Sequence, residues 1–279
     1  LYGFGRNEAL VGETLQPFRN RFFLASKCGM TGVDGKRVID GRPEMLRRTC
    51  KESLRRLRTD VIDLYYLHRW DKQVPVEESV GALADLVREG LIRTIGLSEV
   101  SAQTLRKAHA VHPIAAVQSE YSLWTRNPEI ALLDACRQLG VALVAFSPLG
   151  RGFLANGIAD PRELVEKDIR RGMPRFNPPQ FGRNRRLLDQ FNRVAWEAGC
   201  TPAQLAIAWL LAKAPFVLPI VGTTSIAHLE EDVAASKVRL SAATIETLER
   251  LINAETVSGP RYPAETLTEI DTETTPNAG

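Results

Sequence analysis

Paired cysteines are missing from this chain. Its four cysteines, Cys28, Cys50, Cys136 and Cys200, are isolated, and no CxxC motif occurs. Isolated cysteines are typical of a reduced, cytoplasmic protein and argue against a disulfide framework. No apolar run approaches the length of a membrane span, and the first residues do not resemble a signal peptide. We therefore expect a cytoplasmic protein that does not act at a membrane.

The chain also has no large excess of charge of either sign. The 279 residues include 36 Lys and Arg against 33 Asp and Glu, and the net charge is +3. The most basic stretch is residues 47–58. On a helix, its Cys50, Leu54 and Leu57 would share one face with the preceding Leu46. Its arginines are therefore expected to coat the outer face of a helix and not to bind nucleic acid.

Sequence signatures of several enzyme classes are absent. No GxGxxG follows a strand pattern, and neither GxxxxGK[ST] nor GxSxG occurs. This argues against Rossmann dehydrogenases, P-loop enzymes and α/β-hydrolases. The four histidines, His68, His109, His112 and His228, do not have metal-ligand spacing. We therefore expect no metal site.

Six apolar, strand-like runs are present, and each ends at a polar residue. The terminal residues are Lys27, His68, Ser98, Gln118, Ser147 and Thr223. Helical patterns lie between the runs, and their expected first or capping residues include Asn7, Ser101, Thr201, Ser225 and Ser241. The alternation of strands and helices predicts a parallel sheet with right-handed crossovers. A parallel (β/α)8 barrel gathers the carboxyl ends of its strands on the face that holds the active site. We therefore predict an α/β protein in which these six residues meet at one pocket.

A complete TIM barrel has eight strands, two more than the six strand–helix units found here. The sheet could be open, but the chain begins on a loop that enters a helix, so we expect the first strands to lie upstream of Leu1. Residues 1–279 would then be a single, N-terminally incomplete barrel domain, with a loose tail from about residue 260. The connection 150–184, rich in Gly, Pro and Arg, is long enough to be functional or mobile.

Tyr2, Lys27 and His68 form the central predicted constellation. An ammonium group favours the phenolate form of a nearby tyrosine, which makes that tyrosine a better acid. An imidazole can hold a substrate carbonyl by a hydrogen bond. A proton donor beside an oxygen-orienting group is what carbonyl reduction requires. Each residue alone also has a structural explanation, so the hypothesis depends on the combination at strand ends.

Seven motifs occur in the order expected of the aldo-keto reductase superfamily. They are YGFGRNEALVG, LASKCG, DLYYLHRWD, GLSEVS, QSEYSLWTR, FSPLGRGFL and PIVGTTSIAHLEED. The resemblance extends from Tyr2 to about Asn253. The stretch HAVHPIAAVQSEYSLWTR resembles the bacterial and plant branch that contains pyridoxal and perakine reductases. The resemblance implies a barrel enzyme that reduces aldehydes or ketones to alcohols with a nicotinamide cofactor.

The resemblance also assigns catalytic roles. Tyr2 would be the proton donor, Lys27 its charge partner and His68 the residue that orients the carbonyl. Relatives have a fourth member, an aspartate a few residues before the tyrosine, whereas this chain begins at Leu1. We expect the full-length protein to have that aspartate, and the chain as given to be inactive and unable to close its barrel.

The residues that would hold the nicotinamide follow by resemblance. Ser98 and Gln118 match residues that bind its carboxamide, and Glu99 stands where many relatives have Asn. Phe146 matches the aromatic residue that stacks on the nicotinamide ring. The loop that would lie along the pyrophosphate consists of Ser147, Pro148, Leu149, Gly150, Arg151 and Gly152. Independently of the resemblance, small residues there let backbone N–H groups approach phosphate, and Arg151 adds charge.

A second predicted phosphate turn, Gly222, Thr223 and Thr224, precedes a helix. Helix N-termini attract anions, although the same turn could simply cap the helix. In the family this segment binds the adenosine 2′-phosphate and adenine. His228 stands where many relatives have Arg, Asp232 where many have Asn, and Glu231 matches the adenine-binding acid. Without that arginine the case for NADPH over NADH is weaker, but Arg170, Arg171 or Arg175 could replace it. We expect NADPH, with NADH as the alternative.

Three aromatic residues that follow strands, Trp70, Tyr121 and Trp124, could line a substrate pocket, although ordinary packing explains them equally well. The expected partner is a small carbonyl compound, which the sequence does not identify, and it leaves the oligomeric state open. Two other functions remain in view. One is a cofactor-binding partner protein, as in the potassium-channel β subunits that share this fold. The other is a Schiff-base aldolase using Lys27.

Overall fold

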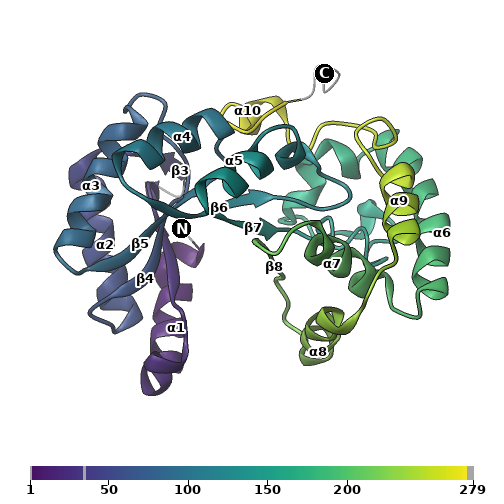
Figure 1. Cartoon of the computed structure of the whole chain (residues 1–279), viewed down its shortest axis with the longest axis horizontal. Helices are drawn as coiled ribbons and strands as arrows, with labels where there is room; N and C mark the ends of the chain where they lie inside the picture. The colour runs from purple at the N-terminus through teal and green to yellow at the C-terminus, as the bar shows by residue number, and fades with distance from the viewer. Residues whose placement is uncertain (1, 34–35, 275–279) are drawn as a thin grey trace. The chain divides into compact units, whose positions relative to one another are not determined.

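The computed structural model describes residues 2–33 and 36–274. The chain divides into two compact units (Figure 1). Unit 1 contains Leu1–Gln118, Asp134–Ala142 and Glu269–Thr272. Unit 2 contains Ser119–Leu133, Leu143–Thr268 and Glu273–Gly279.

The strands are β1 (Ala25–Cys28), β2 (Met30–Val33), β3 (Lys36–Ile39), β4 (Ile62–Leu67), β5 (Ile92–Ser98), β6 (Ile114–Glu120), β7 (Ala142–Phe146) and β8 (Val217–Ile220). The helices are α1 (Arg6–Leu15), α2 (Pro43–Leu57), α3 (Val76–Arg88), α4 (Ala102–Val111), α5 (Leu132–Leu139), α6 (Gln180–Glu197), α7 (Pro202–Lys213), α8 (Ile226–Ala234), α9 (Ala242–Leu251) and α10 (Ala264–Leu267). Short 3₁₀ turns relevant to the sites are η1 (Tyr2–Gly5), η5 (Ile169–Gly172) and η6 (Pro174–Phe176).

The six apolar runs predicted as strands are strands in the structure. They form one sheet in the order β1-β4-β5-β6-β7-β8, and the pairs β1–β4, β4–β5, β5–β6 and β7–β8 are parallel. Helices separate successive strands along the chain, as expected for parallel crossovers. The predicted α/β class is therefore confirmed. The expectation of two further strands upstream of Leu1 stays a prediction.

One element was missed. Strands β2 and β3 form an antiparallel hairpin that pairs Met30 with Ile39 and Val33 with Lys36. The sequence between them is Asp34-Gly35, a dipeptide that commonly joins hairpin strands, and this signal went unused. The two joining residues lie outside the described part of the chain.

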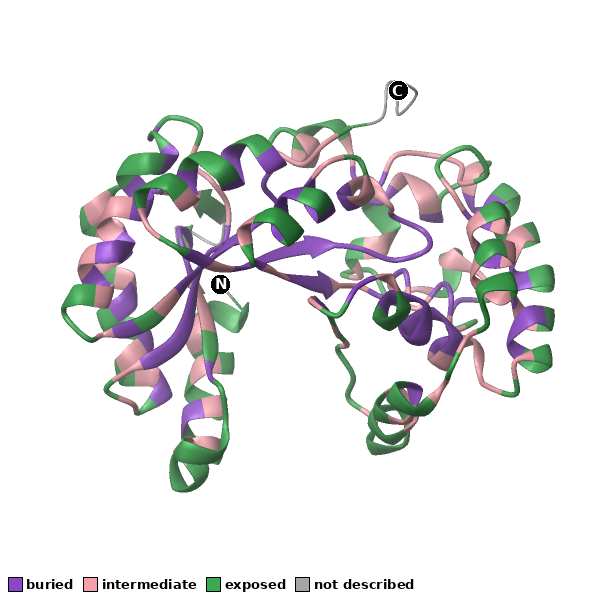
Figure 2. Ribbon diagram, viewed as in Figure 1, coloured by how far each residue is buried: buried purple, intermediate pink, exposed green. Residues whose placement is uncertain are grey.

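In unit 1, helices pack their apolar faces on the strands. Strand β4 is buried along its whole length, which Figure 2 shows as a continuous purple ribbon. Helix α2 buries Leu46, Cys50, Ser53 and Leu57. Leu54, which we expected to be buried on this face, is only partly buried. Ser53 is buried in its place, and its hydroxyl lies 3.4 Å from that of Tyr65. The arginines of α2 lie toward its outer face, where Arg47 pairs with Glu89.

The predicted helix starts are largely confirmed. Ser101, Ser225 and Ser241 accept hydrogen bonds from the backbone N–H groups of residues 104, 228 and 244. Thr201 forms a capping box with Gln204 at the start of α7. Helix α1 begins at Arg6 with Gly5 as its cap, one residue before the predicted start at Asn7. Local side-chain chemistry therefore determines where these helices begin.

The stretch from residue 260 differs from the loose tail that we expected. It contains α10, and Arg261, Tyr262 and Ile270 are buried. Asp271 accepts hydrogen bonds from the backbone and hydroxyl of Ser101 and from the hydroxyl of Thr104. Buried contacts thus hold residues 260–274 in place, despite their polar sequence. The last five residues of the expected tail lie outside the described residues.

Two further properties concern the whole described chain. Among residues 2–33 and 36–274, no helix combines the length and apolar character needed to cross a bilayer. The four cysteines are free thiols; three are buried, and Cys200, just before the capping box of α7, is partly exposed.

Candidate functional site

Tyr2 and Lys27 meet in unit 1. The Lys27 ammonium donates a hydrogen bond to the Tyr2 hydroxyl over 2.9 Å and lies 4.8 Å from the centre of the tyrosine ring. Lys27 belongs to β1, and Tyr2 belongs to η1. Left-handed backbone at Gly3, Phe4 and Gly5 forms the tight bend between Tyr2 and α1. Tyr2 is about half exposed, with 54% of its surface accessible, so its hydroxyl can be reached by a ligand.

His68 lies beside this pair at the end of β4. Its backbone N–H donates to the carbonyl of Cys28, the last residue of β1. The His68 and Tyr2 rings are 5.8 Å apart between centroids. Burial, followed by the charges of Lys27 and Arg69, lowers the pKa of His68 from 6.5 to about 2. The imidazole is therefore neutral near pH 7 and has one N–H group to donate.

No carboxylate completes this cluster. Among the described residues, Lys27 forms no ion pair, and its one hydrogen-bond partner is Tyr2.

The residues predicted to bind the nicotinamide carboxamide are adjacent in unit 1. Ser98 and Gln118 are register partners at the ends of β5 and β6. The Ser98 hydroxyl accepts a hydrogen bond from Arg69 over 3.3 Å. Arg69 also donates to the carbonyl of His68 over 2.7 Å, so one guanidinium links the ends of β4 and β5. Sequence reasoning missed Arg69, whose only signal was its position directly after His68.

Glu99 follows Ser98 in a left-handed conformation, with φ of 56°. Its backbone is fixed on both sides, because its N–H donates to the carbonyl of Gln118 and its carbonyl accepts from the N–H of Asp271. Left-handed backbone is unfavourable for glutamate and more easily adopted by asparagine. This conformation gives a physical reason for the Asn that many relatives have at this position.

The three predicted pocket aromatics have different surroundings. Trp70 is partly buried, and its indole N–H donates to the carbonyl of Val74 over 2.8 Å. Tyr121 is fully buried against Trp209, and its hydroxyl donates to Glu129 over 2.7 Å. Trp124 is also buried, between aromatic neighbours. Tyr121 and Trp124 thus serve packing in this structure, whereas substrate contact by Trp70 stays a prediction.

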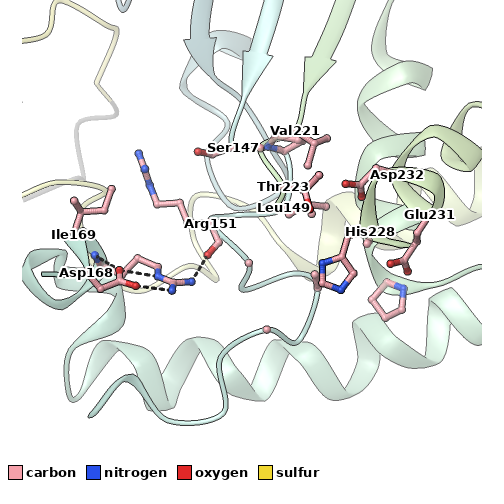
Figure 3. A pocket seen from close by; sticks show the side chains of 18 residues that line it. Ser147, Leu149, Arg151, Asp168, Ile169, Val221, Thr223, His228, Glu231 and Asp232 are labelled. Atoms are coloured by element: carbon pink, nitrogen blue, oxygen red, sulfur yellow. Dashed lines mark hydrogen bonds and ion pairs between the residues drawn. The ribbon is translucent and has the colours of Figure 1, made fainter. Parts of the chain in front are cut away.

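Unit 2 contains a cavity of about 610 Å³ that includes most of the predicted phosphate-binding residues (Figure 3). Its lining includes Ser147, Pro148, Leu149, Arg151, Gly152, Gly222, Thr223, His228, Glu231 and Asp232. The predicted residues Phe146, Gly150 and Thr224 are not part of the lining. Asp168, Ile169, Pro202 and Ala203 line it without having been predicted, because nothing in the sequence links their segments to this cavity.

The loop after β7 is a tight turn with several left-handed residues. Ser147 and Arg151 are left-handed, with φ of 54° and 59°, and so is Gly150. At Gly150 an added Cβ would lie 2.9 Å from the Trp124 ring, so glycine is needed there for close approach as well. Non-glycine residues with positive φ are costly, and they cluster at sites where function depends on a particular backbone.

Buried charge holds this loop. Arg151 donates to Glu120 over 3.0 Å and to the Tyr262 hydroxyl over 2.8 Å. Burial by itself would raise the pKa of Glu120, but Arg261, Arg151 and Arg175 lower it overall. Glu120 therefore stays ionised and holds the Arg151 side chain in place by this ion pair.

The cations expected to replace the missing arginine are in different places. Arg170 lines the cavity, where it donates to both carboxylate oxygens of Asp168 and to the carbonyl of Arg151. Arg171 donates to the carbonyl of Leu164 and is not part of the lining. Arg175 is partly buried beside Trp124, and burial lowers its pKa to about 10. Of the three, only Arg170 lines the cavity, and its guanidinium already pairs with Asp168.

The turn before α8 acts as a cap. Ser225 caps the helix, and Thr223 accepts from the N–H of Ser225 over 3.1 Å. His228, Glu231 and Asp232 lie on α8 and face the cavity in Figure 3. Burial, followed by the neighbouring Glu231, raises the pKa of Asp232. Among the described residues, no group of three His, Cys, Asp or Glu side chains could hold a metal ion.

Both the sequence and the fold of this chain match known proteins. The model of the aldo/keto reductase family matches residues 1–253. The chain belongs to the aldo/keto reductase family. The structure of a glycerol dehydrogenase, AKR11B4 from Gluconobacter oxydans, is similar at a TM-score of 0.82 and 28% identity, over 94% of this chain and 81% of that one. A thermostable aldo-keto reductase, Tm1743, solved with the inhibitor epalrestat, has a TM-score of 0.70 and 31% identity, over 90% and 79%.

Membership of the aldo/keto reductase family confirms the family resemblance and the barrel class inferred from the sequence. It also makes the chain an oxidoreductase that acts on small carbonyl compounds and uses a nicotinamide cofactor. The roles of individual residues, the choice between NADPH and NADH, and the branch of the family are taken up next.

Proposed function

We propose that this protein reduces aldehydes or ketones to alcohols with NADPH, with Tyr2 as the proton donor. The observation that carries the proposal is the 2.9 Å hydrogen bond from Lys27 to the Tyr2 hydroxyl, with the His68 ring 5.8 Å from that of Tyr2. We also propose that it acts in the cytoplasm as a single barrel domain, in the branch of the pyridoxal and perakine reductases.

The residues of unit 2 fit the phosphate and adenosine end of a dinucleotide. The cavity of about 610 Å³ lies within the usual size range of ligand pockets. The left-handed loop 147–152 presents backbone to it, and Arg170 and His228 supply cationic or hydrogen-bonding groups. Glu231 and Asp232 would accept hydrogen bonds from ribose or adenine. When bound, the cofactor supplies the hydride.

The residues of unit 1 would handle the proton and the carbonyl oxygen. Neutral His68 would donate its N–H to the oxygen and orient it. Tyr2 would then transfer its hydroxyl proton to the same oxygen as negative charge develops there. Lys27 would stabilise the resulting phenolate, which makes the transfer easier near neutral pH. Ser98 and Gln118 would bind the carboxamide, and Trp70 would contact the substrate.

The decisive experiment follows oxidation of NADPH by the full-length protein with a panel of aldehydes, beginning with nitrobenzaldehyde. Steady, aldehyde-dependent turnover is expected. Tight NADPH binding without turnover across the panel would contradict the proposal and favour a cofactor-binding partner protein.

Cofactor choice is tested by titrating the protein with NADPH and NADH and following its fluorescence. We expect tighter binding of NADPH, and His228→Arg should increase that preference because it adds a permanent cation beside the phosphate. Preference for NADH by the unaltered protein would contradict the cofactor assignment and leave the proposed reduction intact.

A further inference from the structure

Unit 2 has a second cavity, which the proposed reaction does not use. It has a volume of about 520 Å³ and is lined by residues 159–162, Arg171, residues 176–179, Phe181, Gly182 and Arg185. The volume is within the range of small-molecule sites. None of its lining residues lines the first cavity.

The charged residues around this cavity are three arginines and one aspartate. Arg162 is already neutralised, because it binds both oxygens of Asp160 over 2.5 to 3.0 Å. This pairing also lowers the pKa of Asp160 to about 2. Asp160 thus stays charged and committed to Arg162.

The other two arginines form no ion pair among the described residues, although Arg185 lies close enough to Asp160 to help lower the pKa of that carboxyl. Arg171 donates to the carbonyl of Leu164 over 2.8 Å, and Arg185 to the carbonyl of Ala159 over 3.2 Å. Each bond uses one N–H of a guanidinium that has five. The carbonyls hold the side chains at the cavity without neutralising them, so both keep donors and charge for an anion.

The start of α6 adds to this preference for an anion. Pro178, Pro179, Phe181 and Gly182 belong to the lining, so the first turn of this helix forms part of the wall. That turn has no side-chain cap and no acidic residue. Its partial positive charge is therefore not offset locally.

Most of the remaining wall is apolar. Phe176 and Phe181 stack with their ring centroids 6.4 Å apart and are themselves buried, whereas Pro178 and Pro179 beside them are exposed. An inorganic ion would leave this surface in contact with water. A ligand with an apolar group would cover it, which favours binding by the hydrophobic effect.

We propose that this cavity binds a small organic anion, namely a carboxylate or phosphate monoester that bears an aryl or branched alkyl group. Arg171 and Arg185 would bind the anionic group, and the exposed prolines Pro178 and Pro179 would contact the apolar group. The site is adjacent in sequence to the first cavity, because Arg170 lines that cavity and Arg171 lines this one. A ligand bound here would therefore restrain η5, which carries both arginines.

The test is calorimetric titration of the protein with phenyl phosphate, with NADPH present in excess to occupy the first cavity. Phenylacetate as a second probe distinguishes a carboxylate from a phosphate ligand. We expect saturable binding of at least one probe, and binding of inorganic phosphate weaker by about tenfold or more, because it lacks the apolar group. Absence of saturable binding by both probes, or equal binding of inorganic phosphate, would overturn the proposal.

Variants assign the binding to this cavity. Arg171→Ala combined with Arg185→Ala should weaken binding by about tenfold or more. Gly182→Trp should also weaken it by filling the space, since a Cβ at Gly182 meets nothing within 4 Å. Arg186→Ala, which removes a cation from the same helix outside the lining, should change nothing. Unaltered binding in the double variant would overturn the proposal. Because binding is measured directly, the result does not depend on reductase activity.

Discussion

At the scale of single residues, the most consequential contact is the one between Lys27 and Tyr2. An ammonium on the phenol oxygen is an arrangement that structural packing alone does not require, because Tyr2 is half exposed. The sequence predicted the three residues of this cluster through their positions at a chain start and at two strand ends. It could not predict that Arg69 would bridge His68 and Ser98, because that contact depends on the conformation of one side chain.

Substitution of Tyr2 by Phe should remove the proton donor and leave the rest of the cluster in place. We expect the turnover number to fall by about 100-fold or more, the usual contribution of a general acid. NADPH affinity measured by fluorescence should stay the same. Phe4→Tyr, a change at the exposed neighbour in η1, is the matched control and should have normal turnover. Normal turnover of the Tyr2 variant would exclude the assigned role.

His68 makes stability depend on pH. Burial lowers its folded pKa from 6.5 to about 2, so below pH 6.5 the unfolded chain binds a proton that the folded chain does not. The stability that comes from keeping His68 neutral is therefore fully present above pH 6.5. It is lost as the pH falls below that value toward the folded pKa, by up to about 1.4 kcal/mol per pH unit. Urea unfolding of the unaltered protein and of His68→Gln, above and below pH 6.5, measures the effect. The two should differ in pH slope; equal slopes would contradict the buried, neutral imidazole.

At the scale of elements, the sequence predicted what short-range chemistry determines. The serines and the threonine that cap α4, α7, α8 and α9 were recognisable because a cap needs only one side chain and the next turn. The cavity lining at Asp168 and Ala203 was not, because those residues meet the phosphate loop only through the tertiary fold. The same reason explains why the order of the C-terminal stretch was not predicted. Its polar sequence resembles a loose tail, and only the tertiary fold brings Asp271 to Ser101 and Thr104 at the start of α4.

Asp271 anchors this stretch to the start of α4. It accepts bonds from the Ser101 and Thr104 hydroxyls over 2.9 and 2.6 Å. Asp271→Ala should lower the free energy of unfolding by about 1–3 kcal/mol, the usual value for hydrogen bonds to a charged group. Asp271→Asn should lose less, because it keeps an acceptor. Urea unfolding midpoints give the comparison, and an unchanged midpoint in the alanine variant would show that the stretch is not anchored here.

At the scale of the whole molecule, the functional groups are divided between two compact units. Unit 1 contains the cluster of Tyr2, Lys27 and His68 that we propose for proton transfer. Unit 2 contains the cavity lined by the loop 147–152. Composition and strand order predicted the α/β class, because six alternating strand and helix patterns leave few other topologies. They could not predict the division into units, which depends on the density of tertiary contacts.

A ligand that binds only the folded chain stabilises it by mass action. NADPH at about 100 times its dissociation constant should add about 2.7 kcal/mol and raise the melting temperature. NADH at the same concentration should raise it less if the cofactor assignment is right. A thermal scan with each nucleotide makes the comparison, and an equal or larger shift with NADH would contradict it.

The uneven exposure of the four thiols has a practical consequence. Three are enclosed by protein, and Cys200 alone is partly accessible, next to the capping box of α7. Alkylating reagents should therefore modify one position under native conditions. A fluorophore attached there would report on α7, whose Pro202 and Ala203 line the larger cavity, without any engineered cysteine.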